Sequence, residues 1–182
     1  MMSEDLTDEQ VIDLTKKMLK AALKNTDELK DEMYFQVIKQ IRNNESVESQ
    51  YKGWKILASY ASFFAPSADS VGPVLYYLKH MAQNHPDDEI QVWARYSFVR
   101  IVQCKNNGMR QVLPSDFELR FIRDHKKIPF TVHFFSGGCL DMHVENYTLL
   151  EEVKEDIMDL LGLDKSEKYK YSFFEQSIRP DR

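Results

Sequence analysis

The sequence predicts an α+β protein in which an all-α helical bundle precedes a small unit of hairpin, helix and strand. Apolar residues recur at spacings of three and four up to about residue 125, and they alternate with polar residues after residue 128. The chain is 43% hydrophobic and 12% aromatic, as in globular proteins. Its 182 residues suffice for one good core and a second, smaller one.

The first two helices are indicated by their caps and by one apolar face. Thr7 and Gln10 have the spacing of a capping box, and residues 25–27 are good caps for the second helix. That helix contains DEMYFQVIKQ, and its apolar face is predicted to lie in the core. The face consists of Tyr34, Val37, Ile38 and Ile41. Gln36 and Gln40 on the polar face either satisfy a neighbouring helix end or line a groove for a partner peptide.

Glycine and proline punctuate the rest of the helical half. Gly53 lies inside the third helix, where glycine costs about 1 kcal/mol relative to alanine, so close packing of another backbone is its expected reason and Trp54 is a core anchor. Gly72-Pro73 opens the fourth helix. The fifth begins at the acids after Pro86 and ends at Asn107-Gly108. A short helix follows Ser115.

The carboxy-terminal part alternates as strands do. Seven apolar residues fall on one face if Phe135 pairs with Cys139 across a three-residue glycine loop. Thr148 with Glu151 is expected to cap a helix whose Leu150, Val153, Ile157 and Leu161 cover that face, and Gly162 ends it. YKYSFF is predicted to be a third strand. The order of hairpin, helix and strand suits a partial ubiquitin-like β-grasp unit.

Composition narrows the function classes. The net charge of −5 implies no general nucleic-acid field, although Arg95 to Lys127 carries a local excess of five positive charges. No stretch approaches the roughly 20 apolar residues of a membrane span, and the acidic amino terminus is no signal peptide. Cys104 and Cys139 form no disulfide framework, so a reducing, cytoplasmic setting is expected.

A series of motifs then points to a family. DEMYFQVIKQ is followed by GWKIL at residues 53–57, FAPS at 64–67, YYL at 76–78 and RQVLPSDFEL at 110–119. In order and spacing these resemble the myosin-tail-homology-4 (MyTH4) domain and its exit into a FERM domain. Residues 128–163 are similar to the start of the first, ubiquitin-like FERM lobe. The resemblance places a MyTH4-like bundle at residues 1–125 and a partial FERM lobe at 126–182.

This resemblance implies a non-enzymatic, cytoplasmic and cytoskeleton-associated interaction module without cofactors. Such tandems occur in tails of unconventional myosins and some kinesins. There they bind cargo or membrane-receptor tails, and in some cases microtubules or the motor's own head. The sequence shows no motor and ends at Arg182, before the later FERM lobes, so cargo sites on those lobes are not carried over. An alternative role is a purely structural element that positions those lobes.

Basic residues are the main candidates for partner binding. The carboxy-terminal tails of tubulin are acidic, so a microtubule site needs clustered lysine and arginine. The candidate partner-binding residues are Lys52, Lys55, Arg95, Arg100, Lys105 and Arg110. Arg95 and Arg100 are five residues apart, about 140° around a helix, and do not form a stripe by themselves. A merely solvated surface is the alternative for this group.

Catalysis and metal binding have little support in the sequence. His133, Cys139, Asp141 and His143 share the polar face of the predicted hairpin and are of metal-ligating types. No CxxC or HExxH spacing accompanies them, so a metal protein or hydrolase is the least favoured alternative. We expect no metal, no cofactor, no nucleic acid and no membrane insertion. The predicted partial lobe leaves a sheet edge unpaired and is expected to be marginally stable alone.

Overall fold

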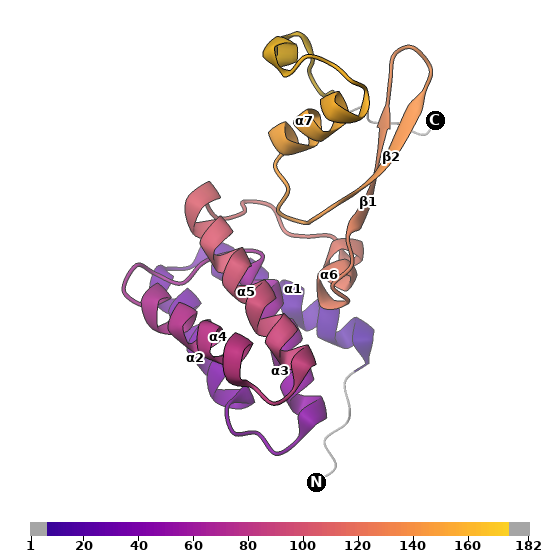
Figure 1. Cartoon of the computed structure of the whole chain (residues 1–182). Helices are drawn as coiled ribbons and strands as arrows, with labels where there is room; N and C mark the ends of the chain where they lie inside the picture. The colour runs from indigo at the N-terminus through magenta and orange to yellow at the C-terminus, as the bar shows by residue number, and fades with distance from the viewer. Residues whose placement is uncertain (1–6, 175–182) are drawn as a thin grey trace, which may run out of the picture. The chain divides into compact units, whose positions relative to one another are not determined.

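The computed structural model describes residues 7–174 of the chain (Figure 1). Its ten elements are α1 (Asp8–Lys24), α2 (Asp27–Ile41), α3 (Val47–Ala61), α4 (Val71–Asn84), α5 (Asp88–Asn107), α6 (Asp116–Arg123), β1 (Ile128–His133), β2 (Cys139–Val144), α7 (Leu150–Leu160) and the 3-10 helix η1 (Lys165–Lys170). The chain divides into two compact units, Met1–Tyr147 and Thr148–Arg182. The predicted fold class, a helical bundle followed by a hairpin and helix, is confirmed.

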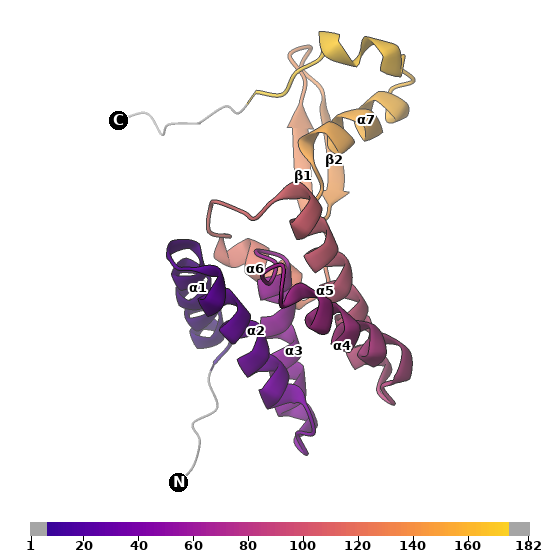
Figure 2. The ribbon, with the colours of Figure 1, turned by 90° about the vertical axis from the view of Figure 1, so that its left-hand side faces the viewer.

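In the first unit, α3 is the central helix of the bundle. It packs against α2, α5 and α6, and it also contacts α1. Figure 2 shows α1 on one side of the bundle, with α4 and α5 paired on the other. The largest fully buried side chains are aromatic and include Trp54, Trp93, Tyr34 and Tyr60. These buried rings show that the core lies between the helices, as the apolar periodicity predicted.

The amino-terminal caps form as the sequence predicted. The Thr7 N–H donates to the Gln10 side chain at 2.8 Å, and the Gln10 N–H donates to Thr7 Oγ1 at 3.3 Å, which completes the capping box. Gly108 ends α5 with φ 88°, a left-handed conformation that favours glycine. The helix boundaries follow from these local signals.

The core face of α2 is also as predicted, with one refinement. Tyr34 and Ile41 are buried, whereas Val37 and Ile38 are partly buried against the core. The Tyr34 hydroxyl donates to the Phe64 carbonyl at 2.7 Å. DEMYFQVIKQ and FAPS are therefore tied together directly in space.

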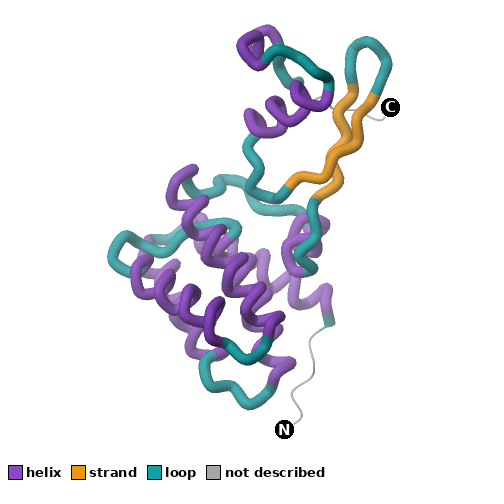
Figure 3. Tube along the Cα trace, in the orientation of Figure 1, coloured by secondary structure: helices purple, strands orange, loops and turns teal. Residues whose placement is uncertain are grey.

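The first unit ends in a two-stranded antiparallel sheet, which Figure 3 shows as the pair of strands. The predicted register was wrong by two residues, because His133 rather than Phe135 lies opposite Cys139. The turn needs five residues: the Phe134 N–H donates to the Gly138 carbonyl at 2.8 Å, and Gly137 takes φ 95°. A shift by two residues leaves each side chain on its face, so the apolar residues of both strands still share one side.

The second unit contains α7 and η1. Helix α7 starts one residue later than predicted, since the Leu149 N–H donates to the Glu152 carboxylate at 2.8 Å. Val153 and Ile157 are buried as expected, but Leu150 and Leu161 are exposed. Gly162, with φ 66°, ends the helix. Its N–H donates to the Asp159 carbonyl and the Leu163 N–H donates to the Met158 carbonyl, which is the Schellman pattern.

The prediction of a third strand at YKYSFF was wrong for the described residues. Lys165–Lys170 form the 3-10 helix η1, and residues 171–174 belong to no regular element. Asp164 caps η1 by accepting from the Ser166 N–H at 2.8 Å, and Lys170 pairs with Glu167 one turn before it. These short-range contacts favour a helical turn over an extended strand.

No described helix has the length and apolarity to cross a membrane.

Candidate protein-interaction surface

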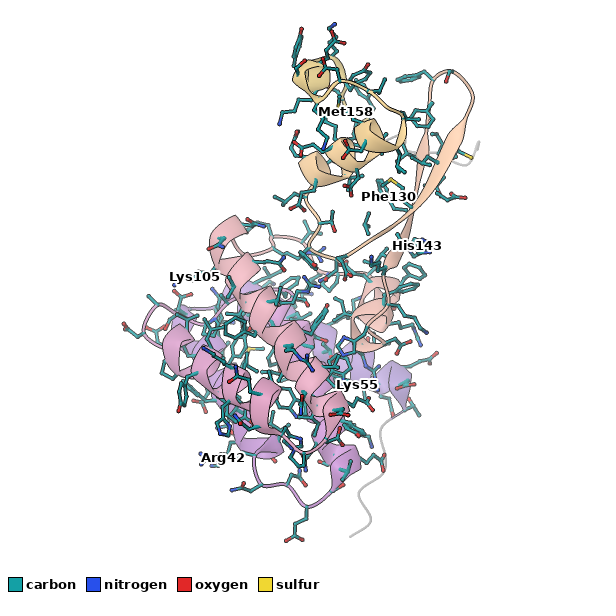
Figure 4. All side chains as sticks on the ribbon, viewed as in Figure 1. Arg42, Lys55, Lys105, Phe130, His143 and Met158 are labelled. Carbon is teal, nitrogen blue, oxygen red and sulfur yellow. The ribbon has the colours of Figure 1, made fainter. Side chains whose placement is uncertain are left out.

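The six candidate basic residues lie on two helices and one connecting segment. Lys52 and Lys55 lie on α3, one turn apart, and Lys52 pairs with Glu48 at 2.9 Å. Arg95 is exposed on α5 and donates to Gln91 of its own helix. Lys105 is exposed near the end of the same helix. Figure 4 shows Lys55 and Lys105 well apart, so these bases do not form one continuous patch.

Arg100 is not a surface residue. It is 4% exposed, and its guanidinium carbon lies 3.1 Å from the centre of the Tyr147 ring and 4.4 Å from that of Tyr96. Its Nη2 donates to Glu145 at 3.3 Å, and its Nη1 donates to Gln103 at 2.7 Å. Arg100 therefore fastens the segment after β2 to α5, and we remove it from the candidate partner surface.

Arg110 also has an internal role. Its side chain makes two hydrogen bonds to the Glu118 carboxylate at the start of α6, and its backbone N–H donates to the Phe63 carbonyl at 3.2 Å. A charge paired in this way presents little net field to a partner. Four bases remain, spread over α3 and α5: Lys55, Arg95, Lys105, and Lys52, whose ion pair with Glu48 is exposed to solvent; we call these four the basic surface.

Asp31 is a structural residue that the sequence reasoning missed. Its carboxylate accepts from the Ser67 N–H at 2.7 Å, from Ser67 Oγ at 2.6 Å and from Ser70 Oγ at 2.6 Å. Burial by itself would raise the pKa of this carboxyl, but the hydrogen bonds from both serines outweigh it and lower the pKa below its ordinary value. Satisfying the end of a neighbouring helix was one expected role of Gln36 and Gln40, but it is Asp31 that bonds to the residues just before α4.

We expect Asp31→Asn to destabilise the bundle by about 1–2 kcal/mol at neutral pH, because the charged acceptor of three hydrogen bonds is lost. The lowered pKa means that this contribution is present above the ordinary carboxyl pKa and is lost as the pH falls. The difference between wild type and variant should therefore shrink in acid. Urea unfolding between pH 7 and pH 3 measures it, and a difference that stays constant over this range would contradict the assignment.

His125 lies at the turn between α6 and β1, beside the rings of Trp93 and Tyr96. Burial, reinforced by the nearby positive charges of Lys55 and Arg100, lowers the pKa of His125 to about 4, while Asp124 acts weakly in the opposite direction. The neutral imidazole is therefore the form that the fold accommodates. The backbone of His125 is left-handed, with φ 52°, a conformation in which asparagine and histidine are enriched.

We expect the stability of the protein to fall by about 1 kcal/mol or more between pH 6.5 and pH 4 because of His125. In this window the unfolded chain binds a proton at His125 and the folded chain does not, so stability rises with pH. Solvent reaches part of the ring and reduces the effect. Urea unfolding of wild type and His125→Asn across this window tests it. Identical pH slopes would refute the assignment.

The four potential metal ligands of the hairpin are spread along its exposed face. His133 lies opposite Cys139, Thr131 opposite Asp141, and Pro129 opposite His143. Thr131 Oγ1 donates to the Asp141 carboxylate at 2.6 Å. Within residues 7–174, no three His, Cys, Asp or Glu side chains gather in a way that could hold a metal ion.

Comparison with known proteins identifies the family to which the helical bundle is similar. Residues 4–121 match the model of the MyTH4 domain family. Myosin-VIIa of Drosophila melanogaster is 30% identical over 136 residues, which are 75% of this chain and 6% of that protein. The MF1 MyTH4-FERM domain of Dictyostelium discoideum myosin VII superposes with a TM-score of 0.75 at 25% identity, over 80% of this chain and 29% of that one.

A second solved structure extends the match beyond the bundle. The human myosin 7b C-terminal MyTH4-FERM domain, solved in complex with the harmonin-a PDZ3 domain, superposes with a TM-score of 0.72 at 22% identity. It covers 91% of this chain and 33% of that one, so the hairpin region corresponds to the start of the FERM part. The chain thus spans less than a tenth of its myosin-VIIa relative and about a third of these solved domains. This chain belongs to the MyTH4 domain family.

Proposed function

We propose that the chain is a non-enzymatic, cytoplasmic interaction module that links a cytoskeletal motor or scaffold to a partner protein. The observation that carries the proposal is the MyTH4 match over residues 4–121, continued by a hairpin that corresponds to the start of a FERM domain. The described residues offer surface bases and a sheet edge as contact features. A cargo or receptor tail, a motor head or tubulin are the partner classes that the family favours.

The basic surface favours acidic partners, and tubulin is the one that can be tested most directly. Among the described residues Lys55, Arg95 and Lys105 have no ion pair with a carboxylate, whereas Lys52 pairs with Glu48. Such charges raise the encounter rate with an acidic polymer and act less at high salt.

We expect the chain to sediment with microtubules at low salt and more weakly at physiological salt. Reversing Lys52, Lys55, Arg95 and Lys105 to glutamate should abolish the pelleting. The matched control reverses four exposed lysines on other helices, namely Lys20, Lys24, Lys39 and Lys79, and has the same net charge change. Equal loss in both quadruple variants would show a general charge effect and no specific surface, and no pelleting of the wild type would remove tubulin as a partner.

The alternative role, positioning later FERM lobes without a ligand, makes a different prediction. A purely structural element captures no partner when the 182-residue chain is used as bait. Capture of a specific cargo tail that is lost in the basic-surface variant supports the module, and retention in the matched control excludes non-specific adsorption. The hydrolase alternative predicts a bound metal, which elemental analysis of the purified chain measures.

A further inference from the structure

The hairpin of the first unit has two outer edges, and neither is paired with another strand within residues 7–174. An unpaired strand presents a row of backbone N–H and C=O groups that can accept a further strand. Partner strands bind such edges through main-chain hydrogen bonds, and their alternate side chains give specificity. The two edges of this hairpin are not equivalent.

The turn fixes which backbone groups face outward. The Phe134 N–H donates across the hairpin to the Gly138 carbonyl, so Phe134 faces its partner strand. Hydrogen-bonding direction alternates along an antiparallel pair. The register then directs the backbone groups of Pro129, Thr131 and His133 outward from β1, and those of Cys139, Asp141 and His143 outward from β2.

Proline makes the β1 edge the poorer acceptor of a strand. Pro129 has no N–H, and it lies at an outward-facing position, where a proline breaks no hydrogen bond within the hairpin. The β1 edge is thus interrupted at its first outward residue. The β2 edge offers all three donors and all three acceptors, with no proline among its six residues. A further strand is therefore expected on β2.

Side chains on the two faces of β2 define the chemistry of the partner strand that would pair with it. Leu140, Met142 and Val144 are half-buried on one face, and Cys139, Asp141 and His143 are exposed on the other. A strand that continues this sheet alternates apolar and polar residues in the same way. Its central polar residue lies directly opposite Asp141.

The charge of Asp141 decides between two kinds of occupant. A second copy of this chain, paired symmetrically over the full length of β2, would place Asp141 against its own symmetry mate, and like charges directly opposite are unfavourable. A strand with lysine or arginine at the central position forms a cross-strand ion pair instead. Asp141 also accepts from Thr131 at 2.6 Å, which holds its carboxylate over the sheet.

We propose that the outer edge of β2 binds an extended partner segment of alternating apolar and polar residues whose central polar residue is basic. This inference deepens the proposed function, because it names a surface and a partner chemistry for the same interaction module. The site lies on the hairpin and does not use the basic surface of α3 and α5. The two proposals can therefore fail separately.

The test is a titration of the full ¹⁵N-labelled chain with two acetylated peptides, VTVKVTV and VTVEVTV, followed by NMR. The lysine peptide should shift the amides of Cys139, Asp141 and His143 and slow their hydrogen exchange. The glutamate peptide should bind more weakly, by up to about fivefold, which is the contribution of one cross-strand ion pair. Asp141→Lys should reverse the preference of the two peptides.

His143→Pro supplies the matched test of the backbone. It removes one outward N–H and no hydrogen bond of the hairpin, as Pro129 already does on β1, so both peptides should lose binding while the remaining spectrum persists. Shifts at Thr131 and His133 instead of β2, binding unaffected by His143→Pro, or no saturable shift would overturn the proposal. If microtubule pelleting or cargo capture succeeds while these titrations fail, only the β2 site is refuted.

Discussion

Gly53→Ala is expected to destabilise the bundle by about 2 kcal/mol, although alanine is the better helix former. A Cβ atom at Gly53 would lie 2.1 Å from Cγ2 of Ile41, far inside van der Waals contact. Ile41 is 3% exposed and β-branched, so this methyl group is held close to the backbone of α2 and cannot swing aside. The helices α2 and α3 must separate to admit the methyl group.

Two further variants distinguish this clash from a general effect of alanine in a helix. Gly72 is the matched control, because a Cβ atom there meets nothing within 4 Å, and Gly72→Ala should be neutral or stabilising by up to about 1 kcal/mol. Ile41→Ala removes the clashing methyl group, so Gly53→Ala should be less harmful in that background.

Urea unfolding with the linear extrapolation method measures the wild type, the three single variants and the double variant Gly53→Ala/Ile41→Ala. For a chain of this size, a loss of 2 kcal/mol corresponds to a fall in Tm of roughly 4–8 °C. Equal effects of alanine at Gly53 and Gly72, or strict additivity with Ile41→Ala, would show that the approach of α2 to α3 is not the reason for Gly53.

The helical half could be predicted from sequence because its signals are local. The capping box of Thr7 and Gln10 and the glycine that ends α5 involve residues within one turn of each other, and both form as expected. A close approach at Gly53 was predicted too, since a helical glycine needs a reason, but the approaching group is the Ile41 side chain and not a backbone. Which residue approaches it, Ile41, could not be read from the spacing.

Long-range contacts account for most of what was missed. Helical spacing predicts which way Arg100 faces along α5, but the residues that bury it, Glu145 and Tyr147, come more than 40 positions later. Asp31 reads as an ordinary acid early in α2, and only the fold brings Ser67 and Ser70 to it. The hairpin register depended on the backbone conformation of Gly137, for which a five-residue turn and a three-residue turn are both plausible.

The prediction of a third strand at YKYSFF was wrong for a related reason. Strand propensity is realised only when a neighbouring strand accepts its hydrogen bonds, and the described sheet has two members. In that situation Lys170 forms a local pair with Glu167, and Lys168 pairs with Glu155 on α7. The segment then follows its short-range contacts.

Arg100→Ala is expected to lower the free energy of unfolding by about 2–4 kcal/mol, because a buried, hydrogen-bonded charge and its stacking on two tyrosine rings are lost together. The side chain joins α5 to the segment after β2 through Glu145 and Tyr147. The nearby Tyr96 hydroxyl adds a hydrogen bond to Asn146 at 3.2 Å. Arg100→Lys should be nearly as harmful, since an ammonium group lacks the planar contact with the rings.

Hydrogen exchange shows where in the first unit Arg100→Ala reduces stability, in addition to how much. In Arg100→Ala the amides of β1 and β2 should lose protection more than those of α2 and α3, because the contact that fastens the hairpin to the bundle is removed. Arg95→Ala is the control on the same helix: the Arg95 side chain is exposed and hydrogen-bonds to Gln91 of its own helix, so its effect should stay within about 0.5 kcal/mol. Equal effects at Arg95 and Arg100, or uniform loss of protection across the first unit, would mean that Arg100 does not act as the fastening between α5 and the hairpin.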